Sequence, residues 1–282
     1  MLAPQHCAPS TLEPHWRCAT SSHAQPGFAP LPSHLAKKTL ASSRSLYFIG
    51  DSLSFQHWAA LLVLLHVSLP SSDAEALACP DLSQLYGSQP AGELVCARVR
   101  GTRRICYLKA GVADTLSIAH GTNRSLADAL RMLSTAPLSA KDAIIANAGV
   151  HPISLRNQIS ELGDSFQLLQ HEGRYEAQPW LLWRETAPVG CTRRTARVPA
   201  AGKHPPNLDS IAATLRIDPG ARMLRVYNLS MGLSMGRPSL GHLNETVNRA
   251  GERVADCMHW CLDTATVVRG WVMVLLERLS KG

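Results

Sequence analysis

Short apolar runs alternate with helical patterns along most of this chain, and that alternation limits the folds that it can adopt. Four runs predict buried strands: Leu46–Ile49, Ala143–Asn147, Trp180–Arg184 and Met223–Asn228. Six patterns predict helices: Leu53–Val67, Leu126–Leu133, Ile159–Leu169, Leu208–Leu215, Glu245–Val254 and Val267–Leu279. The alternation favours an α/β class, a three-layer α/β/α sandwich whose mainly parallel sheet has right-handed crossovers.

The chain is long enough for one domain with a substantial core. It has 282 residues, of which 45% are hydrophobic. We expect an irregular, cysteine-containing N-terminal segment over residues 1–44 and a single α/β domain over residues 45–282. The stretch Leu94–Lys109 interrupts the alternation, and it predicts a small hairpin that turns near Gly101 and carries Cys96 and Cys106.

A serine follows the first predicted strand. Gly50 and Asp51 come directly after the apolar run, so Ser52 opens the next helix. Sites of α/β sheets form at the carboxyl ends of strands, and a helix amino terminus offers N–H groups and a positive dipole to a developing oxyanion. The alternative is ordinary turn chemistry, in which Asp51 only caps the helix.

A serine hydroxyl is a weak nucleophile, so it needs a base and a group that orients that base. Asp256 and His259 can fill these roles, because a separation of three residues lets both side chains face one site from a single loop or helical turn. With Ser52 they predict the triad of a serine esterase or acyltransferase.

Three stretches of the chain resemble the SGNH class of hydrolases and transferases, most closely its PC-esterase or trichome-birefringence-like branch. They are Tyr47–Ser54 with Trp58–Leu62, then Trp183–Pro188, and Asp256–Leu262. In that family the serine matching Ser52 is the acylated nucleophile, and the residues matching Asp256 and His259 complete its triad. The resemblance implies an SGNH-like fold and acyl transfer without a cofactor or a metal. It runs from about Trp16 to the carboxyl terminus, with weak agreement between the motifs.

The resemblance also implies roles for Asn147 and Arg184. Related enzymes use an asparagine at the place of Asn147 as an oxyanion donor, and a neutral amide suits that task beside the Ser52 N–H. The family has an arginine at Arg184, where a guanidinium can hold a carboxylate or a sugar oxygen. The alternatives are an asparagine that ends a strand in a turn and an arginine in a structural ion pair.

A second serine lies in a competing motif. Gly232–Gly236 matches the Gly-x-Ser-x-Gly nucleophile elbow and would place Ser234 after the fourth predicted strand. The elbow requires a helix directly after the serine, but Pro238 intervenes and no helical pattern begins until after Asn244. We therefore favour Ser52.

The cysteines and glycosylation sequons favour a secretory route, with the Golgi lumen or the extracellular space as destination. Eight cysteines permit up to four disulfides, and sequons begin at Asn123, Asn228 and Asn244. The first forty-odd residues contain no apolar leader, whereas members of the resembled family usually have an upstream membrane anchor. We therefore expect a truncated amino terminus, with membrane attachment only through that missing anchor.

Two other classes of partner are disfavoured. The spacing Cys257-x-His259-x-Cys261 offers a zinc alternative, but it lacks the paired Cys-x-x-Cys of structural zinc sites. The net charge of +7 includes arginine clusters at residues 98–104 and 193–197, which can attract an acidic glycan or a nucleic acid. No nucleic-acid motif accompanies them, so a solvated basic surface is the favoured interpretation and no nucleic-acid partner is expected.

The sequence therefore predicts a polysaccharide or glycan O-acetyltransferase that works through a Ser52 acyl-enzyme, with an acetyl donor and a glycan acceptor as its partners. If water resolves the acyl-enzyme, the protein is a carbohydrate esterase instead. A noncatalytic glycan-binding module of the same fold is the third hypothesis, and the presence of Ser52, Asp256 and His259 together argues against it.

Overall fold

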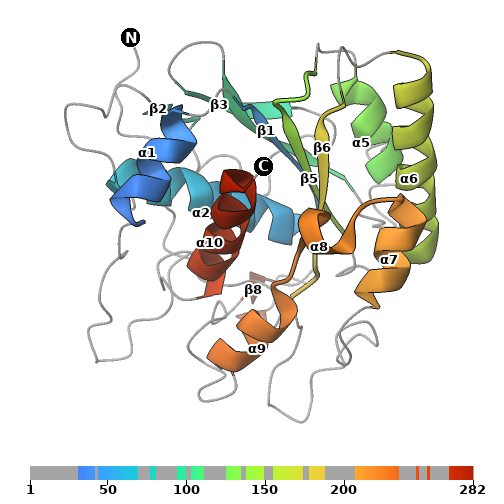
Figure 1. Ribbon diagram of the computed structural model, residues 1–282. Helices are drawn as coiled ribbons and strands as arrows, with labels where there is room; N and C mark the ends of the chain where they lie inside the picture. Colours follow the sequence, from blue (N-terminus) through green and yellow to red (C-terminus); the bar gives the residue numbers. More distant parts are fainter. Residues whose placement is uncertain are drawn as a thin grey trace.

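The computed structural model describes residues 31–41, 44–68, 77–80, 94–99, 103–110, 125–134, 138–148, 155–173, 178–187, 207–234, 246–247, 253–254 and 267–281. A seven-stranded sheet lies at the centre, and helices cover both of its faces (Figure 1). Among the helices in these ranges, none is both long and apolar enough to cross a lipid bilayer.

Five strands of the sheet are parallel: β1 (Leu46–Gly50), β4 (Arg104–Lys109), β5 (Ala143–Asn147), β6 (Trp180–Arg184) and β7 (Met223–Leu224). The antiparallel strands β2 (Leu77–Ala78) and β3 (Leu94–Val99) extend one edge, giving the order β2-β3-β4-β1-β5-β6-β7. After β1 the chain forms β2, β3 and β4 on one side of β1, and it then crosses to form β5, β6 and β7 on the other side. Sites of doubly wound sheets form where the strand order reverses, at the carboxyl ends of the strands, which here means β1 and β5.

Alternation along the strands divides the core into two layers. Leu46 and Phe48 of β1 belong to one buried cluster, while Tyr47 and Ile49 belong to the other. The first cluster packs under α1 (Ser33–Ala41), α2 (Ser52–Ser68) and α10 (Val267–Ser280). The second packs under α5 (Leu126–Leu133), α6 (Leu155–His171) and α7 (Leu208–Leu215). The sheet is therefore covered by helices on both faces, as expected for an α/β sandwich.

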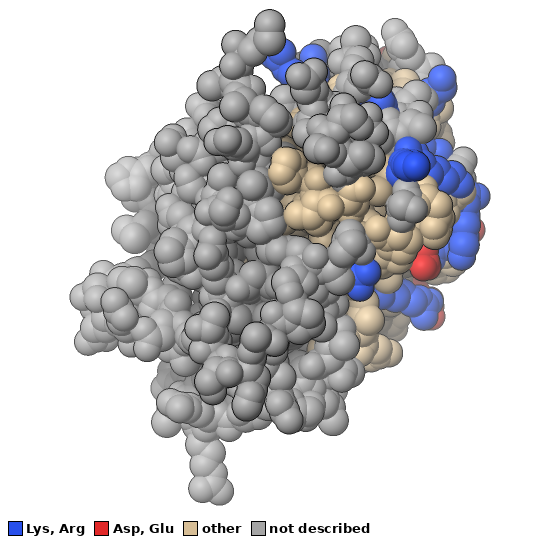
Figure 2. All heavy atoms as spheres, turned by 90° about the vertical axis from the view of Figure 1, so that its left-hand side faces the viewer, with Lys and Arg blue, Asp and Glu red and all other residues tan. Residues whose placement is uncertain are grey.

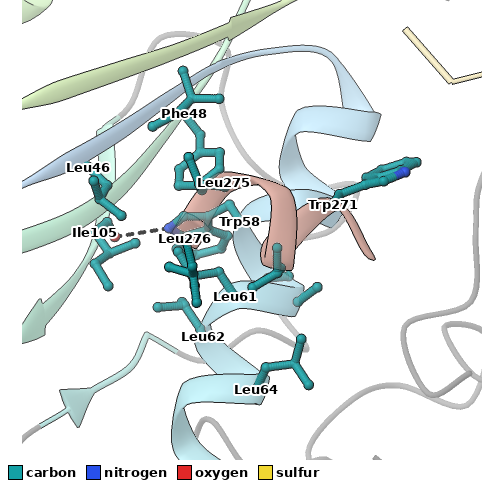
Figure 3. Close-up of a cluster of buried hydrophobic side chains, with 14 of the residues drawn as sticks. Leu46, Phe48, Trp58, Leu61, Leu62, Leu64, Ile105, Trp271, Leu275 and Leu276 are labelled. Atoms are coloured by element: carbon teal, nitrogen blue, oxygen red, sulfur yellow. Dashed lines mark hydrogen bonds between the residues drawn. The ribbon is translucent and has the colours of Figure 1, made fainter. Parts of the chain in front are cut away.

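Helix α2 is the central element of the first layer. Leu61 and Leu62 of α2 lie beside Leu275 and Leu276 of α10 (Figure 3). The indole of Trp58 donates a hydrogen bond of 2.9 Å from Nε1 to the carbonyl oxygen of Ile105 in β4, and so ties α2 to the sheet (Figure 3). These contacts fix the helix that begins at Ser52.

Most predicted elements agree with the structure. The strands β5 and β6 and the helices α5 and α7 have the predicted bounds, and the hairpin of β3 and β4 is confirmed. Cys96 and Cys106 face each other across this hairpin and form a disulfide. The α/β class with a mainly parallel sheet is thus confirmed.

The strand predicted over Met223–Asn228 is wrong beyond Leu224, because helix α9 (Tyr227–Ser234) begins three residues later. A carboxylate oxygen of Glu185, Oε2, accepts the backbone N–H of Tyr227 at 2.8 Å and satisfies the first turn of that helix. The short helix α8 (Pro219–Arg222), which begins at an Asp-Pro pair, was not predicted either.

Two other predictions are corrected. The helix over Glu245–Val254 is wrong, since Thr246–Val247 (β8) pairs antiparallel with Arg253–Val254 (β9) and β-branched residues favour that extended backbone. The prediction that residues 1–44 are irregular is wrong for α1, because Leu35 and Ala36 are buried in the first core layer and order that helix.

Candidate functional site

Ser52 lies at the carboxyl end of β1, as the first residue of α2. Every residue from Asp51 to Leu65 is buried except Ser52, which is half-buried. The helix is apolar nearly all round, so its middle is enclosed by the sheet and by α10, and only its two ends reach the surface. The place is the point of strand-order reversal, where a ligand site is expected.

Gly50 makes the tight turn before Ser52 possible. Its φ of 151° is a conformation that residues with side chains rarely adopt. A Cβ atom at this position would overlap Ser54 Oγ and the backbone oxygen of Asn147. The Gly50 carbonyl oxygen accepts hydrogen bonds from the Ala110 N–H at 2.8 Å and the Tyr107 hydroxyl at 3.2 Å, which hold the turn against β4.

Asp51 caps the helix that carries Ser52. Its Oδ1 accepts the N–H of Leu53 at 3.0 Å, and its backbone oxygen accepts the N–H groups of Ser54 at 3.0 Å and Phe55 at 3.1 Å. The capping role considered for Asp51 is therefore confirmed. It is compatible with a reactive Ser52, since it fixes the direction of the first turn.

Asn147 ends β5 directly beside Gly50 and is fully buried. Its Nδ2 donates to the backbone oxygen of Arg184 at 2.9 Å and to Thr186 Oγ1 at 3.2 Å. Its Oδ1 accepts from Nη2 of Arg184. The amide is thus engaged with the end of β6, and it donates to an oxyanion only if Nδ2 leaves Thr186.

Arg184 is fully buried at the end of β6. Burial lowers its pKa to about 10, and the negative charge of Asp51 acts in the opposite direction. Its Cζ atom lies 4.8 Å from the centre of the Trp271 ring. A guanidinium enclosed in this way does not reach a substrate carboxylate or sugar, so the geometry favours a structural role, in which Arg184 donates a hydrogen bond to Asn147 and interacts with Asp51 through charge alone.

His57 is a residue of this region that the sequence analysis missed. It is fully buried one turn after Ser52, with its ring edge-on to Phe48 at 5.1 Å and to Trp271 at 6.1 Å between centroids. Burial, and then the charge of Arg184, lower the pKa of His57 well below its ordinary value, so it is neutral at pH 7. The signal in the sequence is a histidine among the apolar residues in the first half of the predicted helix, which also contains His66 near its end.

Trp271 joins this cluster to the carboxyl-terminal helices, and it too was missed. Its Nε1 donates to Ser230 Oγ at 2.9 Å, and that hydroxyl donates to the Val226 oxygen at 2.7 Å. The buried side chains of this region therefore come from six elements: β1, α2, β5, β6, α9 and α10.

Several predicted residues lie outside the described ranges: Asp256, His259, Cys257 and Cys261. Ser234 is the last residue of α9, whereas a nucleophile elbow places its serine at the start of a helix, so the structure disfavours the competing motif. In the described part of the chain, no group of three or more His, Cys, Asp or Glu side chains is placed to hold a metal ion.

Basic side chains are prominent on the described part of the face shown in Figure 2, where Lys and Arg occupy more of the surface than Asp and Glu. Arg98 and Arg104, from one of the arginine clusters, are exposed and lie opposite each other on β3 and β4. These two residues fit a solvated basic surface.

No protein-family model matches this chain, and no curated protein matches it. The resemblance to the PC-esterase branch therefore stays a prediction that depends on the three motifs alone.

Proposed function

We propose that this protein is a glycan O-acetyltransferase that works through an acyl ester on Ser52, with a fold of the SGNH class. One observation carries the proposal: within the buried run from Asp51 to Leu65, Ser52 alone is half-buried, at the strand-order reversal of the sheet. Its partial exposure gives a substrate access to the hydroxyl, which the buried side chains around it lack.

In the proposed mechanism His259, oriented by Asp256, takes the proton of Ser52 Oγ, and Oγ attacks the acyl carbonyl carbon. The tetrahedral oxyanion collapses, the bond to the donor oxygen breaks, and His259 returns the proton to the leaving group. An acceptor hydroxyl then repeats these steps on the acyl-enzyme. Each step moves one proton and one electron pair, so no cofactor is needed.

The proposed oxyanion donors are the Ser52 N–H and the Asn147 amide. The N–H groups of Leu53, Ser54 and Phe55 all donate to Asp51, so we do not assign them to the substrate. The positive end of α2 adds to the stabilisation, because a helix dipole favours negative charge at its amino terminus.

We further propose a secretory location, which the disulfide between Cys96 and Cys106 supports, since structural disulfides persist in oxidising compartments. The acceptor is a sugar hydroxyl in an acetyltransferase and water in a carbohydrate esterase. The two differ in whether the site binds glycan and excludes water.

The experiment is intact-protein mass spectrometry after incubation with an activated acetyl ester, on wild type, Ser52→Ala and Ser234→Ala. We expect one added acetyl group in wild type and in Ser234→Ala, and none in Ser52→Ala. An adduct lost only in Ser234→Ala would refute the assignment of Ser52. Candidate glycans then separate the two enzymes, because a transferase moves the acetyl group to the sugar and an esterase releases acetate.

A further inference from the structure

Arg184 lies where a charged group is costly to keep. The side chain is fully buried, and its Nε and Nη1 atoms have no hydrogen-bond partner among the residues that the structure describes. A buried cation with unsatisfied donors lowers stability, so an apolar side chain of similar volume would suit the fold better unless the guanidinium has another role. Its contacts indicate what that role is.

The first contact is reciprocal. Nη2 of Arg184 donates to Oδ1 of Asn147, and Nδ2 of Asn147 donates to the backbone oxygen of Arg184 at 2.9 Å. This pair joins the carboxyl ends of β5 and β6. A flipped amide would place its NH2 group against the guanidinium, so Arg184 fixes the orientation of Asn147.

Asn147 lies against Gly50, in the turn that precedes Ser52. The strand register pairs Asn147 with Gly50, and the space at Gly50 is too small for a Cβ because of Ser54 and the Asn147 backbone oxygen. Asp51 follows Gly50 in the chain, and its negative charge acts on Arg184. Its Oδ1 accepts the N–H of Leu53 and so holds the first turn of α2. One guanidinium therefore acts on both residues that define this turn.

Aromatic rings pack on another side of Arg184. Trp271 lies over the guanidinium, and the neutral ring of His57 lies edge-on to Trp271. Ser230 fixes the Trp271 indole through its Nε1. Arg184 cannot touch a substrate from this position, so any effect on chemistry has to pass through Asn147 and Asp51.

We propose that Arg184 is the positioning residue for acyl transfer at Ser52: its hydrogen bond to Asn147 and its charge near Asp51 hold the Gly50–Ser52 turn in the geometry of attack. The inference rests on the proposed function of Ser52. Because attack is sensitive to displacements of about 1 Å, loss of the guanidinium slows acylation much more than it weakens donor binding.

The test uses Arg184→Gln and Arg184→Lys, with Arg222→Gln and Arg222→Lys as matched controls. Arg222 also lies over an indole, with Cζ 4.6 Å from the Trp180 ring, but Trp180 begins β6 and so lies at the opposite end of that strand. The acylation rate at saturating acetyl ester and the KM for that ester are measured on each folded variant, with folding checked by circular dichroism.

We expect Arg184→Gln to lower the limiting acylation rate about 100-fold. We expect its KM to change less than about threefold, since a loss confined to the transition state leaves ground-state binding intact. Arg184→Lys should recover about tenfold of that loss, because it keeps the charge but lacks the planar fork. The Arg222 variants should acylate at the wild-type rate.

The outcomes separate the two proposals. Wild type without a Ser52 adduct overturns the proposed function and this inference with it. Wild type that acylates, beside a folded Arg184→Gln that acylates equally fast, overturns the inference alone, as does an equal loss in the Arg222 variants. Where Arg184→Gln does not fold, Arg184→Lys decides: slower acylation supports the inference, and a wild-type rate overturns it. If neither folds, Arg184 serves folding alone and the inference is wrong.

Discussion

His57 is a buried, neutral histidine, and this makes the stability of the fold depend on pH. Its pKa in the folded protein is well below its ordinary value, because of burial and the charge of Arg184. Below about pH 6.5 the unfolded chain binds a proton at this residue that the folded chain does not. The stabilisation is therefore complete above about pH 6.5 and is lost as the pH falls from there towards the folded pKa.

We expect His57→Gln to reduce the slope of unfolding free energy against pH by up to about 1.4 kcal/mol per pH unit between pH 6.5 and 5. Urea denaturation at a series of pH values measures this slope, which is independent of any constant loss from the substitution itself. His66→Gln is the matched control, since the pKa of that half-buried histidine on the same helix is lowered by burial alone and its effect should be smaller. Equal slopes in wild type and His57→Gln would contradict the prediction.

The candidate nucleophile could be predicted from a short stretch of sequence, but the residues that surround it could not. Gly50, Asp51 and Ser52 are adjacent in sequence, and a glycine turn with an aspartate cap can be recognised from three residues. The environment of Arg184 depends on Asp51, Asn147 and Trp271, which come from different elements. A sequence shows an arginine at the end of a strand, but not that its guanidinium is fully buried between Asn147 and Trp271.

Among the elements, α6 and α7 approach closely at Gly163. A Cβ on this residue would lie 2.8 Å from the backbone oxygen of Thr214 and 3.3 Å from the Cα of Leu215. Alanine in place of glycine usually stabilises a helix interior by about 0.5–1 kcal/mol. Here the neighbouring atoms belong to a backbone, so the two helices must separate.

We expect Gly163→Ala to lower the free energy of unfolding by about 1–3 kcal/mol, which reverses the usual sign. Gly270→Ala in α10 is the matched control. Its Cβ would lie 2.6 Å from Cδ2 of Leu229, the end of a flexible side chain that can rotate away, so its cost should be smaller. Thermal and urea unfolding of both variants measure the difference, and a Gly163→Ala protein as stable as wild type would show that the helices can move apart freely.

Elements were predicted best where their own residues determine them. The strands β5 and β6 are apolar, short and enclosed on both faces, and both were predicted with their observed bounds. The prediction over Met223–Asn228 failed because the start of α9 is stabilised by Glu185, which is 42 residues away in the chain. The prediction over Glu245–Val254 failed for a different reason, because its two ends pair with each other as β8 and β9.

For the whole molecule, the composition and the alternation indicated one α/β domain, but not the order of the strands. Strand order depends on which helices pack together, such as α2 with α10, whose sequences are separated by most of the domain. The count of cysteines likewise indicated disulfides without their pairing. The antiparallel register of β3 and β4 supplies it, by setting Cys96 opposite Cys106.

This disulfide closes the hairpin at one side of the sheet, with a sequence separation of 10 residues. The cross-link restricts the unfolded chain, and a loop of that length corresponds to a stabilisation of about 2–3 kcal/mol. We expect a Cys96→Ala/Cys106→Ala protein to lose stability by that amount, because the ladder between β3 and β4 must then be maintained by hydrogen bonds and packing alone. Urea unfolding under non-reducing conditions measures the loss.

Wild type treated with reductant is the control. Cys79, which is also disulfide-bonded, keeps its bridge in the double variant and loses it in reduced wild type. The two samples therefore separate the effect of the hairpin cross-link from the effect of the Cys79 bridge. Equal stability of the double variant and untreated wild type would show that the fold does not depend on the cross-link.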